Sequence, residues 1–193
     1  MTMKRITRIL PLFIAGIVAF SCGPKKVENT NEVAEDANEE KFNDRKDEKD
    51  AEFVVETVAS NYAEIALAML AKEKSDNQQV KDVAQELEAG HNKILGELQS
   101  FASAKVITVP TEAKDAEQKT IEKLREEKDV KEFNKKWSKE LVDKHEKSIK
   151  EFEARLEKTQ DADLKIWIEQ TLPHLREHLD KVKALESSVT ASK

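Results

Sequence analysis

The residues of this chain with the clearest capacity for chemistry are its four histidines. A neutral imidazole is the commonest protein ligand for a transition metal ion. His91, His145 and His178 fall on apolar stripes with helical periodicity, and His174 lies at the edge of the stripe that carries His178. Because each histidine lies near the middle of its predicted helix, we expect the four side chains to meet in one central layer.

Two glutamates are candidate partners of this layer. Glu64 lies near the same level on the first long helix, and Glu88 is three residues before His91 on the same helical face. Di-iron sites in helical bundles require two Glu-x-x-His pairs, whereas valine and leucine stand three residues before the histidines of the last two helices. The pattern therefore argues against a di-iron centre and indicates a histidine-rich site. The candidate metal ligands are Glu64, Glu88, His91, His145, His174 and His178.

The layer has two interpretations. Three imidazoles with one carboxylate suit zinc, copper or a single iron ion as cofactor. Alternatively, the histidines are buried groups that hydrogen-bond their neighbours, in which case the layer sets the register of the helices. The pattern favours the structural interpretation and leaves the metal site as the alternative. No pattern predicts a catalytic residue or a site for an organic cofactor.

The elements that must position these residues are helices. Charged residues make up 37% of the chain, aromatic residues only 5%, and there are four glycines and four prolines. This composition is typical of an all-α protein. We predict a ferritin-like four-helix bundle with a long crossover that carries a short extra helix. The predicted long helices span 50–72, 76–103, 129–158 and 162–186, with an extended connection over 104–111 and the short helix over 115–128.

Residues 1–21 have the pattern of an export signal. Lys4, Arg5 and Arg8 precede an apolar run that ends at Phe20 and is shorter than the roughly 20 residues that span a bilayer. The only cysteine, Cys22, follows directly, and Ala19-Phe20-Ser21-Cys22 resembles a bacterial lipoprotein box. We therefore expect Cys22 to be lipidated and to anchor the protein to a membrane.

The region between the anchor and the helices is rich in charged residues and poor in apolar ones. We predict a disordered tether over 22–49 and a folded domain over 50–188. Loss of the leader removes three positive charges and changes the net charge from −6 to −9. An acidic chain without a basic stripe is a poor partner for nucleic acid. The expected location is the bacterial cell envelope, at the inner or outer membrane, with the domain in the periplasm or at the cell surface.

Several stretches resemble a bacterial family known as domain of unknown function 4142. The matching residues are Asp50-Ala51-Glu52-Phe53, Glu64, Phe133 with Trp137, His145-Glu146 and Thr171-Leu172-Pro173-His174-Leu175-Arg176-Glu177-His178-Leu179. Gly90 departs from the pattern, because the family usually has Asp before the second-helix histidine. The resemblance implies an exported, ferritin-like protein without an assigned reaction. From the chain as a whole we expect a binding or structural module of the envelope. The alternative is a metal-binding bundle that could carry out redox chemistry at a histidine-rich central site.

Overall fold

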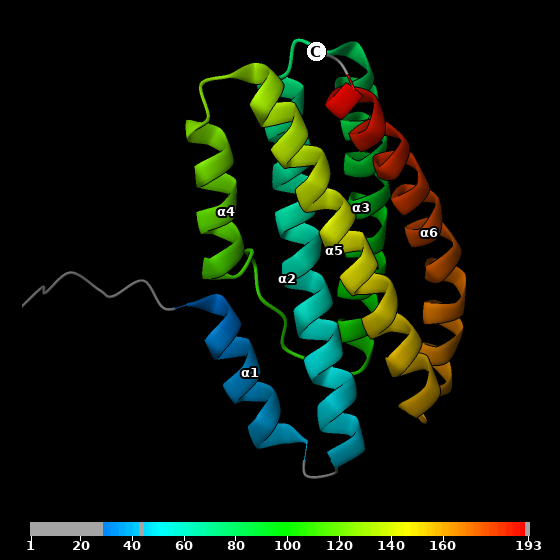
Figure 1. Ribbon diagram of the computed structural model, residues 1–193. Coiled ribbons are helices and arrows are strands. Elements are labelled where there is room, and N and C mark those ends of the chain that lie inside the picture. The colour runs from blue at the N-terminus through cyan, green and yellow to red at the C-terminus, as the bar shows by residue number, and fades with distance from the viewer. Residues whose placement is uncertain (1–28, 43–44, 192–193) are drawn as a thin grey trace, which may run out of the picture.

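The protein is helical throughout the part of the chain that the structure describes. The computed structural model describes residues 29–42 and 45–191, which form six α-helices and no strand (Figure 1). The prediction of an all-α fold is confirmed. The helices are α1 (Thr30–Lys41), α2 (Arg45–Lys74), α3 (Gln78–Ala104), α4 (Asp115–Glu126), α5 (Val130–Lys158) and α6 (Ala162–Ala191).

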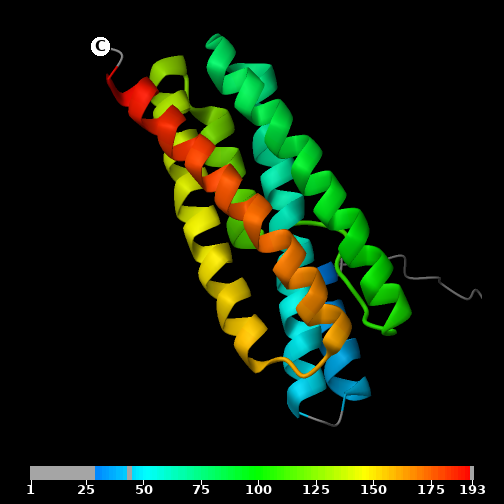
Figure 2. The same ribbon diagram turned by 90° about the vertical axis from the view of Figure 1, so that its right-hand side faces the viewer.

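The four long helices lie side by side as two antiparallel pairs. α2 packs mainly on α3 and α5 mainly on α6, and the two pairs meet where α2 contacts α5 and α3 contacts α6 (Figures 1 and 2). α4 lies in the connection between α3 and α5, as predicted, and packs against α2. Every residue at mid-height on an inner face therefore points toward the same central volume.

Side-chain caps fix where three of the long helices begin. Asn77 Oδ1 accepts hydrogen bonds from the backbone of the first turn of α3, and Asp129 Oδ1 does the same for α5. Asp161 Oδ1 accepts from the backbone N–H groups of Asp163 and Leu164 in the first turn of α6. Each such cap is worth about 1 kcal/mol. These caps set the register that brings the helix midpoints to one level.

The predicted disordered tether over 22–49 is wrong for the described residues of that segment. Residues 30–41 form α1, and α2 begins at Arg45. The reason is tertiary packing: Ala34 is fully buried, and the Asn38 side chain exchanges two 2.8 Å hydrogen bonds with the backbone of Thr108. The hydrogen bonds between Asn38 and Thr108 thus hold α1 in place, although this segment has few apolar side chains to bury. The predicted export signal, residues 1–21, and Cys22 lie outside the described residues.

The apolar core is divided into two clusters along the helix axes. One is built around Phe133 and Trp137, and the indole Nε1 of Trp137 donates to the Leu67 carbonyl at 2.8 Å. The other is built around Leu98, Leu164 and Ile168. The clusters divide at the level where the histidines lie. α2 is long and apolar enough to span a membrane by length and composition, but 61% of that stretch is buried inside the protein.

Candidate metal centre

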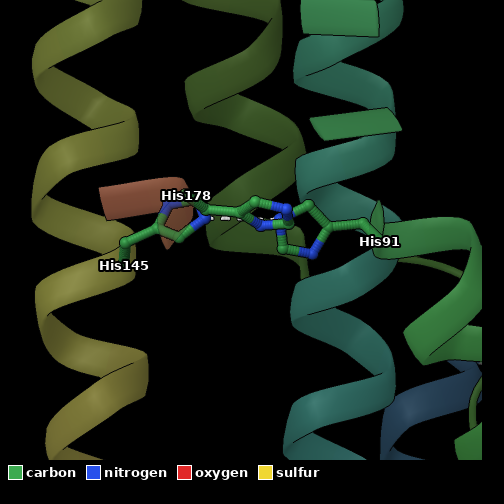
Figure 3. A group of neighbouring side chains, drawn as sticks. All are labelled: His91, His145 and His178. Carbon is green, nitrogen blue, oxygen red and sulfur yellow. Dashed lines mark hydrogen bonds between the residues drawn. The ribbon is translucent and has the colours of Figure 1, made fainter. Parts of the chain in front are cut away.

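Three of the four histidines meet at the centre of the protein. His91 of α3, His145 of α5 and His178 of α6 each offer a ring nitrogen, and these nitrogens lie within 4.8 Å of one another (Figure 3). Their exposed fractions are 1%, 0% and 8%. Three helices thus deliver three imidazoles to one point that solvent barely reaches.

Glu64 completes the cluster from α2. Its Oε2 atom lies 3.1 Å from His91 Nε2 and 3.4 Å from His145 Nδ1, and the side chain is 3% exposed. Oε2 nevertheless accepts no well-oriented hydrogen bond from a described residue. A buried carboxylate oxygen without such a donor is costly unless a cation lies beside it.

Neighbouring oxygens orient two of the rings. Asn61 Oδ1 lies 2.9 Å from His91 Nδ1, and the Leu141 carbonyl oxygen lies 2.9 Å from His145 Nδ1. Asn61 Nδ2 donates to the backbone of Thr57, which fixes the amide orientation. From these bonds we assign the ring hydrogens to Nδ1, so both Nε2 atoms are acceptors, and they face each other at 3.4 Å.

The third ring lies against the backbone of α3. A Cβ atom on Gly90 would fall 2.5 Å from His178 Cε1 and 2.7 Å from Nε2, so the ring fits only because residue 90 has no side chain. His178 Nδ1 is buried without a hydrogen-bond partner among the described residues. The sequence marks Gly90 as a departure from the family pattern but does not indicate this contact.

Burial and the charges of neighbouring groups favour the protonation states that bind a metal ion, which are a neutral imidazole and an ionised carboxylate. Burial lowers the pKa of His145, and Glu64 offsets this only in part. Burial, together with His91 and His145, lowers the pKa of His178 to about 3. Burial alone would raise the pKa of Glu64, but His91, His145 and Lys144 outweigh it and lower that pKa. At neutral pH the cluster therefore offers neutral imidazoles at His145 and His178 and an ionised carboxylate.

Two of the six predicted ligands lie outside this cluster. Glu88 is three residues before His91, which rotates it by about 60° on the helix, and it forms a 2.5 Å ion pair with Lys72 near the surface. His174 is exposed at the mouth of a 130 Å³ cavity whose inner wall is His178. The structure thus brings together four of the predicted ligands, Glu64, His91, His145 and His178. They form a three-nitrogen, one-oxygen donor set, which suits zinc, copper or a single iron ion.

Comparison with known proteins identifies the family alone. The sequence model described as Domain of unknown function (DUF4142) matches residues 32–185. No curated protein and no solved structure matches the chain.

Proposed function

The chain belongs to the DUF4142 family, and since that family has no assigned function, we propose from the site alone that this protein binds one divalent transition metal ion. The ligands are His91, His145, His178 and Glu64. The observation that carries the proposal is the convergence of three buried histidine nitrogens within 4.8 Å of one another from three different helices.

The unsatisfied atoms of the cluster support the same proposal. With the ring hydrogens assigned to Nδ1, His91 Nε2 and His145 Nε2 are acceptors that face each other, and Glu64 Oε2 beside them has no hydrogen-bond donor among the described residues. Such an arrangement is repulsive unless a proton or a metal ion lies at its centre. His178 Nδ1, also buried without a described partner, supplies one more potential donor atom.

A structural layer is the competing function, and two contacts favour it. The bonds from His91 to Asn61 and from His145 to the Leu141 carbonyl would hold the rings even without a metal ion. In that case a proton shared with Glu64 takes the place of the metal, and the protein acts as a binding or structural module of the envelope. The two functions differ in metal content and in which variants lose the metal.

Metal content decides between them. The chain from residue 23 onward, which keeps all six helices, is produced without a histidine tag, loaded separately with iron, zinc and copper, and desalted. We expect about one equivalent of at least one metal by elemental analysis, and its loss in His145→Gln and His178→Gln. His174→Gln is the matched control and should keep the metal. Substoichiometric metal in all three loadings would refute the proposal, as would full retention in both cluster variants.

The fold supports a further assignment to the ferritin-like four-helix bundles. The two antiparallel pairs, joined by the long connection that contains α4, have the connectivity of a bundle with one crossover. An experimental structure in which α3 and α5 run antiparallel would contradict this assignment.

We propose that the protein is a lipoprotein of the bacterial cell envelope, anchored at Cys22. The support is the charged and apolar leader that ends at the only cysteine. Labelling of cells with a radioactive fatty acid should mark the full chain, and Cys22→Ser should abolish the label. Equal labelling of the variant would rule out the anchor.

A further inference from the structure

Besides the 130 Å³ cavity at His178, a larger cavity reaches the proposed metal site from the side of α2. A cavity of about 470 Å³ opens between α2 and α5, next to the start of α4, and reaches Glu64 and His91. This volume is within the range of pockets that hold small organic molecules. The cluster is therefore shielded from bulk solvent but is accessible to a ligand that enters between the two helices.

One cationic side chain in the wall of this cavity lies close to the cluster. The Lys144 side chain is only 12% exposed, and its ammonium group forms an ion pair with Glu117 in the first turn of α4. Burial alone would lower the pKa of Lys144, but the carboxylates of Glu64 and Glu117 outweigh it and raise that pKa. The cavity thus contains a fixed positive charge beside its innermost carboxylate.

The remaining wall combines apolar side chains with the polar residues Thr57, Ser60 and Asn61 of α2. Phe53, Ile94, Phe152 and Leu175 contribute to it, and the other lysines at the rim are more exposed. Charge interactions are stronger next to such a surface than in water. Arg155, the other cation of the wall with little exposure, is paired with Asp50. Lys144, whose charge acts on Glu64, is therefore the cation that an anion bound beside Glu64 would meet.

Coordination chemistry indicates which side of the proposed metal ion is open to a ligand from the cavity. The chain supplies four ligands, which would close a tetrahedral zinc site, whereas an ion that takes five or six ligands, such as iron, would keep a position open to an exogenous ligand. Of the four ligands, Glu64 and His91 line the cavity, whereas His145 and His178 do not. We therefore place the open position on the α2 side, where the larger cavity has room for an exogenous ligand, rather than at the 130 Å³ cavity beside His178.

We propose that this cavity admits a small anion, from azide up to a small organic carboxylate, which coordinates the metal ion beside Glu64 and is held by the ammonium group of Lys144. The inference rests on the proposed metal site and adds an exogenous ligand to it. Glu117 competes with that ligand for Lys144, because both are anions that pair with the same ammonium group.

The test is an azide titration of the cobalt-loaded chain from residue 23 onward. Cobalt reports its ligands through its visible absorption, and we expect a saturable change with a stoichiometry of one azide. Lys144→Met should weaken azide binding about tenfold, which is close to 1.4 kcal/mol. Glu117→Gln should tighten it, because the ammonium group is released. Lys139→Met is the matched control, since Lys139 is on the same helix, exposed, and paired with Asp143.

The metal content of each variant separates this inference from the metal site itself. Lys144→Met should hold cobalt at least as tightly as the parent, because a positive charge beside the cation is removed. Stoichiometric cobalt without an azide response would overturn the anion site and leave the metal site standing. Unchanged azide affinity in both Lys144→Met and Glu117→Gln would overturn the role of Lys144. Absence of bound cobalt, together with substoichiometric iron, zinc and copper, would overturn both proposals.

Discussion

His91 Nε2 and His145 Nε2 face each other at 3.4 Å in the buried centre of the protein. Each ring has its Nδ1 2.9 Å from an oxygen, on Asn61 and on Leu141 respectively. These two bonds leave an unprotonated nitrogen on each ring, and two lone pairs at this distance repel. A shared proton or a metal ion between the two nitrogens would relieve this repulsion, and a metal ion that replaces a proton there would release that proton on binding.

Gly90→Ala should weaken metal binding but leave the stability of the metal-free protein nearly unchanged. The new Cβ atom would lie 2.5 Å from the His178 ring, and the ring, as the end of a side chain, can rotate away at modest cost. We expect metal affinity to fall at least tenfold, whereas the unfolding free energy of the metal-free protein should change by less than about 1 kcal/mol, because alanine is the better helix former. Metal titration and urea unfolding measure the two effects.

Gly96→Ala is the matched control for that substitution. Gly96 is on the same helix, and its new methyl group would meet no neighbouring side chain within 4 Å. This variant should keep full metal affinity and gain about 0.5–1 kcal/mol of stability. Equal metal affinity in the two variants would show that His178 is not a ligand.

The stability of the metal-free protein should fall when the pH is lowered from 7 to 5. Unfolded His178 takes up a proton below about pH 6.5, whereas the folded residue has a pKa of about 3. The unfolded state therefore binds more protons in this range, and His178 contributes a loss of about 2 kcal/mol by pH 5. His145, whose pKa is also lowered, acts in the same direction.

Urea unfolding of the metal-free chain at pH 7 and pH 5 measures this loss. His178→Gln should remove a large part of it, because glutamine has no proton to take up. His174→Gln should leave it unchanged, since His174 is exposed. A stability that is independent of pH in this range would mean that the His178 ring is open to solvent.

The sequence was sufficient to predict the four long helices and the level at which the candidate site forms. Apolar periodicity gave the four long helices, and their midpoints placed His91, His145, His178 and Glu64 in one layer, which the structure shows. Periodicity could not decide which of two residues three or four positions apart on one helix points into the candidate site. Glu88 and His174 are at most 60° from a cluster residue by helical spacing, yet both side chains point to the surface.

Features that depend on contacts between distant segments were not predictable. α1 has the composition of a tether, and it is ordered through Asn38 and the backbone of Thr108, 70 residues away. The role of Gly90 requires the position of His178 on another helix. Each of these follows from packing that a single sequence does not specify.

Asn38→Ala should detach α1 from the rest of the protein. The substitution removes both 2.8 Å hydrogen bonds between Asn38 and Thr108. The backbone N–H and carbonyl groups of Thr108 then lose their partner, at a cost of about 1–3 kcal/mol. We expect faster amide hydrogen exchange across α1 and unchanged exchange in α3 and α5. Glu40→Ala, an exposed change on the same helix, should have no such effect. Uniform exchange in the Asn38 variant would contradict the anchoring role.

Glu64→Gln should weaken metal binding, although glutamine has nearly the same size and shape as glutamate. A neutral amide is a poorer ligand than the carboxylate, whose charge is held by a lowered pKa. We expect the metal affinity to fall at least tenfold, so that saturating metal raises the urea midpoint less than in the parent protein. Glu88→Gln is the matched control, because Glu88 pairs with Lys72 near the surface. It should bind metal with the parent affinity. If instead the Glu88 variant loses metal and the Glu64 variant retains it, the carboxylate ligand comes from α3 and the cluster rearranges on binding.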